Sequence, residues 1–209
     1  MSPEIEQLLK YFILFFVVIE PISLVPMFGA LTRGLDAAAR RRTAFKAVAI
    51  STVIFLAFAL TGSWLLSSLG ISVSAFKIAG GLLLFLLAVD MVFARDSGVR
   101  SATVREQEEA RFRQDVSVFP VAFPLIAGPG ALATVLLIVV DIDSMVMFAG
   151  MLGVLALVLL ITIALLLLTT PVMRIMGVTG GNVISRLAGV VLAALAAQYV
   201  LDGVLESLA

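Results

Sequence analysis

Cysteine and histidine are both absent from this 209-residue sequence. Their absence excludes disulfide bonds, thiolate chemistry, imidazole acid–base catalysis and the zinc sites that are built from these ligands. A nucleotide-binding loop of the form Gly-x4-Gly-Lys-Ser/Thr is also missing, which argues against direct use of ATP. The formal net charge is zero and gives no indication of nucleic acid. We therefore expect a protein without a metal, a cofactor or a nucleic-acid partner.

Charged residues are scarce as well. They make up 13% of the chain, whereas hydrophobic residues make up 62% and the mean hydropathy is +1.18. A soluble domain cannot bury so much apolar surface, so this composition indicates an integral membrane protein. Spans of about 20 residues cross a bilayer, and six fit the sequence: Leu8–Leu31, Ala44–Leu69, Ser72–Phe93, Val116–Val140, Met145–Thr170 and Val183–Leu201. Strands of alternating polarity are absent, which predicts an all-α polytopic fold.

Basic residues gather at alternate ends of the predicted spans and set the orientation of the chain. One cluster follows the first span and another follows the third: Arg33, Arg40, Arg41, Arg42 and Lys46, then Arg95, Arg100, Arg105, Arg111 and Arg113. Lys and Arg favour the cytoplasmic side. We therefore expect a multi-pass plasma-membrane protein with both termini outside the cytoplasm. The start of the chain lacks the basic stretch of a signal peptide, so the first span is expected to stay in the membrane.

Two of the spans carry the same proline spacing. The first contains Pro21-Ile-Ser-Leu-Val-Pro26, and the fourth contains Pro124-Leu-Ile-Ala-Gly-Pro129-Gly130. Each proline removes a backbone donor and clashes with the carbonyl one turn earlier, so a membrane helix must bend or open there. Inside lipid, freed carbonyls are tolerated only where they are buried in protein or line a wet cavity. The motif predicts that spans one and four are broken at Pro-x4-Pro, and it points to a transport site.

Further matches link the two halves of the chain. Pro21 and Pro124 are 103 residues apart, Gly70 and Gly177 are 107 apart, and Lys77 and Arg186 are 109 apart. Three spans per copy would invert the second copy, as in many secondary transporters. We predict two inverted three-helix repeats, residues 1–94 and 116–209, joined by a charged cytoplasmic linker at 95–115. Gly and Pro coincidences are common in membrane helices, but the order of these matches makes chance the weaker explanation.

Glu20 is the sharpest candidate for function, because a carboxylate inside a membrane span is costly unless it is partnered, solvated or protonated. It could couple transport to protons or sodium ions, or accept a substrate ammonium; the alternative is an ion pair with Lys77. Freed carbonyls suit an ammonium group, and helix amino termini after each break suit a carboxylate. A small zwitterionic solute fits both, although a plain proline kink remains the alternative. The predicted substrate site comprises Glu20, Pro21, Ser23, Pro26, Pro124, Gly128, Pro129 and Gly130.

Three other ionisable residues could couple or gate transport: Lys77, Asp90 and Arg186. Lys77 and Arg186 begin equivalent spans, and each could instead reach an interface and anchor its helix. Asp90 follows Lys77 by 13 residues, about 20 Å along a helix, so the two cannot pair within it; solvation near the cytoplasmic boundary is its alternative. Gly80 and Gly81 could serve packing within one subunit or between the subunits of a homo-oligomer.

The order and spacing of these motifs resemble the MarC family of bacterial and archaeal inner-membrane proteins over nearly the whole chain. The matching segments are Glu20-Pro21-x4-Pro26, Lys77-Ile-Ala-Gly-Gly81, Ala127-Gly128-Pro129-Gly130, Arg186-Leu-Ala-Gly189 and Gln198-Tyr-Val-Leu-Asp202-Gly203. The resemblance implies six spans in two inverted repeats, a relationship to the lysine-exporter group, and transport of small neutral amino acids such as alanine or glycine. The family usually has Asp or Asn before the first proline, so Glu20 is a longer variant.

The residues and the resemblance together favour a secondary transporter that is coupled to protons through Glu20. Export of another small metabolite or a drug remains an alternative, as does a channel or a scaffold without carrier activity. An enzyme is not expected, because the ionisable residues are separated across the spans and no nucleophile and base can be assigned.

Overall fold

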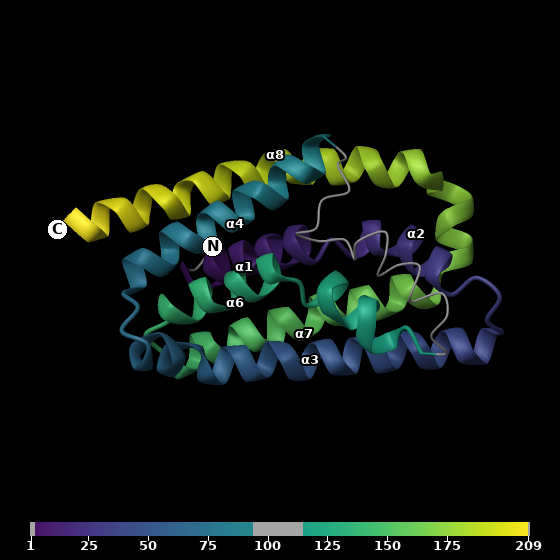
Figure 1. The fold of residues 1–209 in the computed structure, drawn as a ribbon, viewed down its shortest axis with the longest axis horizontal. Coiled ribbons are helices and arrows are strands. Elements are labelled where there is room, and N and C mark those ends of the chain that lie inside the picture. Colours follow the sequence, from purple (N-terminus) through teal and green to yellow (C-terminus); the bar gives the residue numbers. More distant parts are fainter. Residues whose placement is uncertain (1–2, 94–114, 209) are drawn as a thin grey trace.

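A computed structural model describes residues 3–93 and 115–208, and every regular element in these stretches is helical (Figure 1). The elements are α1 (Pro3–Ile19), α2 (Pro21–Leu31), α3 (Ala37–Ser68), α4 (Val73–Phe93), η1 (Ser117–Ile126), α6 (Pro129–Val140), α7 (Met145–Leu167) and α8 (Thr169–Leu208). The predicted all-α membrane fold is confirmed. The predicted linker lies outside the described residues except for Asp115.

Six apolar segments of the described chain are long enough to cross a bilayer when η1 and α6 count as one bent span. The predicted number of spans is therefore confirmed, although several helices extend beyond the predicted limits. One case is α3, which begins at Ala37 instead of Ala44. The Asp36 side chain accepts a hydrogen bond of 2.7 Å from the Ala39 amide and caps the helix. Because of this cap, α3 begins with a basic segment that precedes its apolar stretch.

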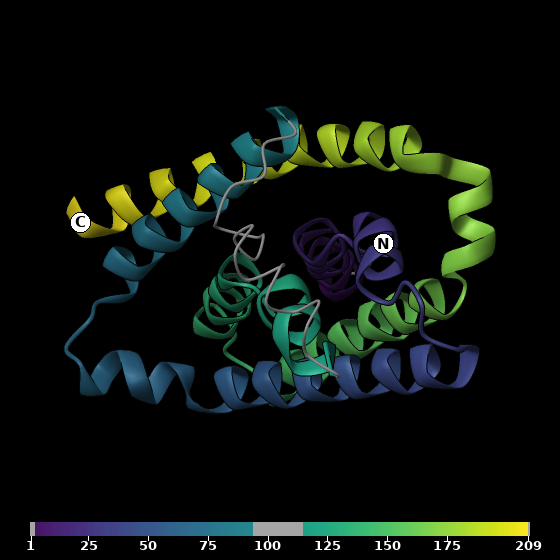
Figure 2. The same ribbon diagram turned by 45° about the vertical axis from the view of Figure 1, so that its right-hand side comes forward.

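The helices form three layers (Figures 1 and 2). The segments α1, α2, η1 and α6 make the middle layer, α3 and α7 cover one side of it, and α4 and α8 cover the other. The contacts agree with this arrangement, because α3 packs on η1 and α6, α7 packs on α1 and α2, and α8 packs on α2. Large middle-layer side chains such as Phe15, Phe28 and Leu137 are fully buried. The helices of the two interrupted spans therefore make the core of the protein.

Both termini lie at the same end of the bundle, beside the α3–α4 and α6–α7 turns (Figure 1). The opposite end holds the α2–α3 connection, the start of η1 and the junction of α7 with α8. The first turns of α8 cross this end at an angle to the rest of the helix (Figure 2). Arg33, Arg40, Arg41 and Arg42 belong to this second end, which we call the basic end.

Small residues let α4 pack closely against α8. A Cβ at Gly81 would lie 2.9 Å from the carbonyl oxygen of Ala196, and one at Gly189 would lie 3.1 Å from the carbonyl oxygen of Ala88. Neither backbone contact leaves room for a side chain. Gly81 therefore serves packing within the subunit, which was one of its two predicted roles.

Candidate functional site

The first span is interrupted at Glu20, directly before Pro21. Glu20 adopts the left-handed conformation (φ 54°, ψ 57°), and α2 begins at Pro21. This conformation costs a non-glycine residue about 1–3 kcal/mol, and such strain clusters at functional sites. The predicted break is confirmed at the first proline of the motif. Pro26 lies inside α2, and α1 and α2 together still form one candidate span, Pro3–Leu31.

The Glu20 carboxylate lies in the protein interior. The residue is only 5% exposed, and its Oε1 accepts a hydrogen bond of 2.9 Å from the Ser23 hydroxyl. Its carbonyl accepts the Ser23 amide at 3.1 Å and the Leu24 amide at 3.3 Å. The backbone of Glu20 thus begins α2, while its side chain is held over the first turn of that helix.

The second interruption divides the fourth span into η1 and α6, which meet at a bend of 54°. Phe119 and Phe123 inside η1 have extended backbones, and each precedes a proline, a position where the helical conformation is disfavoured. The peptide bonds after both phenylalanines are cis. Regular helix resumes only at Pro129. The predicted break in span four is therefore confirmed, and the chain leaves the helical conformation before both prolines of its motif, Pro124 and Pro129.

Gly128 allows the backbone to turn closely at this second break. It precedes Pro129 as the N-cap of α6, and a Cβ at Gly128 would lie 2.5 Å from the carbonyl oxygen of Pro124. No side chain fits in that space. The close approach of these two backbone segments therefore requires a glycine at position 128.

A serine from α3 supports the irregular segment, and the sequence did not single it out. Ser51 is fully buried, and its hydroxyl contacts the Ala122 carbonyl of η1 at 3.3 Å and the Ala47 carbonyl of its own helix at 3.0 Å. The Ala122 carbonyl also accepts the Ala127 amide at 2.8 Å. A serine inside a helix usually bonds its own backbone, so only the tertiary structure reveals this second contact.

The two breaks lie side by side in the middle layer. A Cβ at Gly130 would lie 3.8 Å from Val18 Cγ1 and 2.9 Å from Leu87 Cδ2; Val18 precedes Glu20 by two residues, and Gly130 follows Gly128 by two. The end of α1 therefore lies against the start of α6, and α2 contacts η1. Glu20 and Gly128, which precede the first residues of α2 and α6, are 108 residues apart.

Lys77 lies away from the breaks, at the end of the bundle that holds both termini. The residue is 7% exposed, and its Nζ lies 2.8 Å from Asp141 Oδ1 and 2.6 Å from Glu206 Oε1. Within the described residues, Lys77 pairs with these two carboxylates and not with Glu20. The lysine joins α4 to the end of α6 and to the last turn of α8.

The other two predicted coupling residues have different surroundings. Arg186 is exposed on α8, unlike its sequence counterpart Lys77, so one of the two matched cations is buried and the other is not. Asp90 is half-buried in the last turn of α4. In the described part of the chain, no group of three or more acidic side chains could hold a metal ion.

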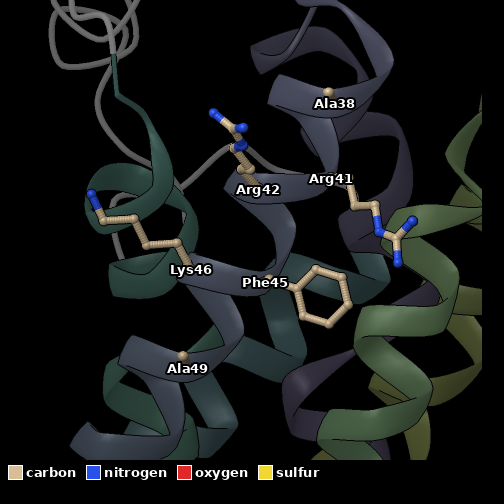
Figure 3. Close-up of a pocket in the computed structure, with 6 residues that line it drawn as sticks. All are labelled: Ala38, Arg41, Arg42, Phe45, Lys46 and Ala49. Atoms are coloured by element: carbon tan, nitrogen blue, oxygen red, sulfur yellow. The ribbon is translucent and has the colours of Figure 1, made fainter.

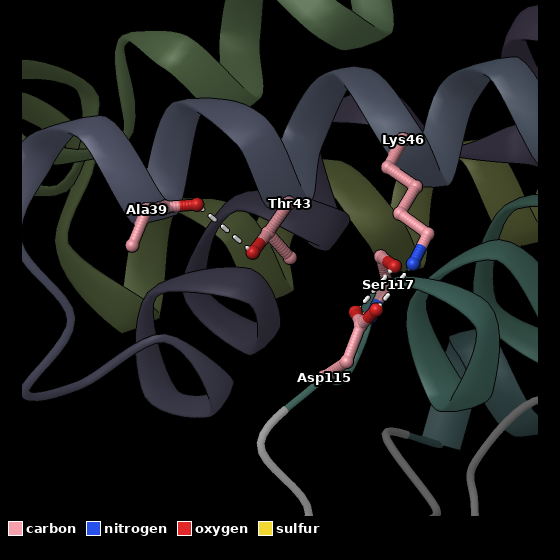
Figure 4. Close-up of polar contacts among 5 residues, drawn as sticks. All are labelled: Ala39, Thr43, Lys46, Asp115 and Ser117. Carbon is pink, nitrogen blue, oxygen red and sulfur yellow. Dashed lines mark hydrogen bonds and ion pairs between the residues drawn. The ribbon is translucent and has the colours of Figure 1, made fainter.

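A second ion pair, at the basic end, joins α3 to the residue two positions before η1. Arg41, Arg42 and Lys46 project from the early turns of α3 (Figure 3), and Lys46 pairs with Asp115 at the start of η1 (Figure 4). The Lys46 ammonium and the Ser117 hydroxyl and amide lower the pKa of Asp115 to about 2. The Ser117 amide donates to Asp115 at 3.0 Å. The sequence placed Asp115 in the linker and gave no signal for this contact.

Comparison with known proteins decides the family. The model of the MarC family of integral membrane proteins matches residues 5–208. The chain belongs to the MarC family. A UPF0056 membrane protein of Methanocaldococcus jannaschii is 36% identical, with 94% of this chain and 97% of that protein covered. The UPF0056 membrane protein YvbG of Bacillus subtilis is 35% identical, with 88% of each chain covered.

The MarC match extends to other bacteria, and the relatives' names describe membrane proteins without stating a substrate. The UPF0056 membrane protein YhcE of Escherichia coli is 31% identical, with 93% of this chain and 90% of that protein covered. No solved structure matches this MarC chain. The resemblance inferred from the motifs is therefore confirmed at the level of the family.

Proposed function

We propose that this MarC protein is a secondary transporter that carries a small neutral amino acid, such as alanine or glycine, across a bacterial or archaeal plasma membrane. One observation carries the proposal: two membrane spans are interrupted side by side in the buried core, at Glu20–Pro21 and at Gly128–Pro129. Interrupted helices at mid-membrane are the usual place for a transporter's substrate. We assign the protein no enzymatic role.

The chemistry at the breaks suits a zwitterion. Both α2 and α6 begin with a proline at the break, and their amino-terminal ends carry the positive end of the helix dipole, which favours a carboxylate. The Glu20 carboxylate is the complementary group for an ammonium. The Ile22 carbonyl adds an acceptor, because Pro26 has no N–H to occupy it. A small amino acid would satisfy both ends, and a buried carboxyl such as Glu20 would also exchange a proton.

The contacts of the middle layer support the predicted inverted repeats. In the first half, α2 packs against α7 and α8 of the second half; in the second half, α6 packs against α3 and α4 of the first. The breaks before α2 and α6 are 108 residues apart, between the offsets of 107 and 109 for the Gly70–Gly177 and Lys77–Arg186 pairs. Each interrupted span thus lies against the other half, as alternating access requires.

Ion pairs between the halves would control access at each end. Lys77 of the first half pairs with Asp141 and Glu206 of the second, and Lys46 pairs with Asp115 at the opposite end. We propose that rocking of the two halves opens one set of pairs at a time. The basic end faces the cytoplasm, because Lys and Arg favour that side, and both termini then lie outside.

Counterflow in proteoliposomes tests this function. A screen of amino acids for thermal stabilisation first selects the solute, since a ligand of the folded state raises its apparent stability. We expect labelled alanine or glycine to exchange against the unlabelled solute. A channel would pass the solute without counterflow, and failure of every stabilising solute to exchange would refute a carrier.

Coupling through Glu20 is tested separately. Glu20→Gln should retain counterflow but lose uptake driven by a pH gradient. Glu6→Gln removes an exposed carboxylate from the same span and should leave both activities intact. Full gradient-driven uptake by Glu20→Gln would show that protons are coupled elsewhere.

A further inference from the structure

The basic end carries a shallow depression on the outer surface of α3 (Figure 3). It encloses about 650 Å³ and is lined by Ala38, Arg41, Arg42, Phe45, Lys46 and Ala49. Three of these six residues are cationic. Asp115 compensates the charge of Lys46, so the depression keeps a net positive charge from its two arginines.

Arg41 and Arg42 are available to an external anion. In the two described stretches, neither forms an ion pair with a carboxylate of this chain. The Arg41 guanidinium lies 5.7 Å from the centre of the Phe45 ring, which holds it beside the depression. Arg41 and Arg42 project to different sides of the depression (Figure 3), and each guanidinium presents a planar array of N–H donors that matches the oxygens of a phosphate.

An exposed apolar stripe continues from the depression along the same face of α3. Phe45, Val53, Leu60 and Trp64 are between 47% and 69% exposed and follow one another at nearly helical spacing. Phe45 and Trp64 are 19 residues apart, about 28 Å along the helix axis, which is close to the thickness of a bilayer's hydrocarbon core. Arg41 and Arg42 therefore lie just beyond the hydrocarbon boundary, at the level of the lipid headgroups.

We propose that this depression binds the headgroup phosphate of an anionic phospholipid, whose acyl chain lies along the stripe that begins at Phe45. The occupant is a lipid and not a soluble anion, because the cationic depression is continuous along α3 with exposed apolar side chains that need a hydrocarbon partner. Basic pockets at the cytoplasmic ends of membrane helices select anionic headgroups in this way. The inference rests on the membrane location of α3 and is independent of the transported solute.

A lipid titration tests the site. Detergent-solubilised protein is titrated with phosphatidylglycerol or with phosphatidylcholine of the same acyl chains, and the unfolding temperature is recorded. We expect phosphatidylglycerol to stabilise the protein and phosphatidylcholine to have little effect. In Arg41→Gln/Arg42→Gln, the apparent affinity for phosphatidylglycerol should fall roughly 30-fold, since each arginine near the headgroups contributes about a fivefold effect.

The matched control is Arg33→Gln/Arg174→Gln, which removes two exposed arginines from the same end but outside the depression. It should keep the wild-type response. If both double variants lost the same affinity for phosphatidylglycerol, general surface charge would explain the binding, and the proposed site would be wrong. Equal stabilisation by inorganic phosphate would overturn the choice of a lipid.

A second measurement keeps the proposal testable if the arginine variant does not fold. Because the chain has no cysteine, Ala49→Cys can carry a single fluorophore at the depression, and Leu160→Cys can carry the same fluorophore on the exposed face of α7. Spin-labelled phosphatidylglycerol should quench the first probe at least threefold more than spin-labelled phosphatidylcholine and the second probe equally. Equal quenching of the Ala49→Cys probe by both lipids would refute the site.

Discussion

Lys77 and Glu206, 129 residues apart in the chain, form an ion pair of 2.6 Å between α4 and the last turn of α8. The lysine side chain is 9% exposed, whereas the carboxylate is 46% exposed. Asp141 offers a second oxygen at 2.8 Å and is also half-exposed. Two accessible carboxylates thus neutralise one nearly buried cation, which predicts that either carboxylate can substitute for the other.

Removal of one carboxylate should therefore cost much less than removal of both. We expect Glu206→Gln or Asp141→Asn to lower the free energy of unfolding by less than about 1 kcal/mol, and the double variant to lower it by about 2–3 kcal/mol, because Lys77 is then buried without a partner. A double-mutant cycle in mixed micelles measures the difference. Asp143→Asn, an exposed change in the same turn as Asp141, is the control. Simple additivity of the two single changes would contradict the shared role.

Asp115 predicts a pH dependence of stability. Its pKa is lowered from 3.8 to about 2 by the Lys46 ammonium and by Ser117. Because the pKa of the folded state lies below that of the unfolded state, the stabilisation is complete above about pH 4 and is lost as the pH falls through about 2. We expect Asp115→Asn to cost less than about 1 kcal/mol at neutral pH, since the pair is exposed, and the difference from wild type to vanish near pH 2.

Acid titration of the unfolding free energy measures this difference. Lys46→Met removes the other partner and should show a similar small loss at neutral pH, and the double variant should be no worse than either single change. A deficit of Asp115→Asn that stays constant down to pH 2 would show that the ion pair is not its cause.

The fold was largely predictable because its signals are local. Long apolar runs define the spans, and prolines in a membrane helix have few tolerated outcomes. What could not be predicted is which proline opens each motif. In span one, the chain leaves the helical conformation only before the first proline, at Glu20; in span four, it does so before both prolines, at Phe123 and at Gly128. The packing around each motif decides this, and spacing alone does not contain it.

The polar contacts were less predictable for the same reason. The sequence identified Glu20 as costly and Lys77 as a candidate for coupling or gating, but Asp141, Glu206 and Ser51 become partners only through the packing of distant helices. Asp141 and Glu206 lie near helix ends, and Ser51 is a single hydroxyl inside an apolar helix, so none of the three stands out in the sequence. A charge beside a loop is normally solvated, so no local pattern favoured the observed pairs.

Gly128 predicts a steric effect at the second break. A Cβ there would lie 2.5 Å from the Pro124 carbonyl oxygen, a backbone atom that cannot move alone. We expect Gly128→Ala to lower the free energy of unfolding by about 1–3 kcal/mol. Gly153→Ala on α7 is the matched control, because its Cβ would meet nothing within 4 Å, and it should stabilise the helix by up to about 1 kcal/mol. Equal effects of the two changes in a denaturant titration would rule out close packing as the reason for Gly128.

Glu20 combines a strained backbone with the side chain that we propose couples transport to protons, and substitution can separate the two. Glu20→Ala and Glu20→Gly both remove the carboxylate, but glycine adopts a φ of 54° without steric cost. We expect Glu20→Gly to be more stable than Glu20→Ala by about 1–2 kcal/mol, measured as the difference in the free energy of unfolding. Both variants should lose the gradient-driven uptake that depends on the carboxylate. Equal stability of Glu20→Ala and Glu20→Gly would show that residue 20 is not left-handed in the folded protein. The proposed break before Pro21 would then be wrong.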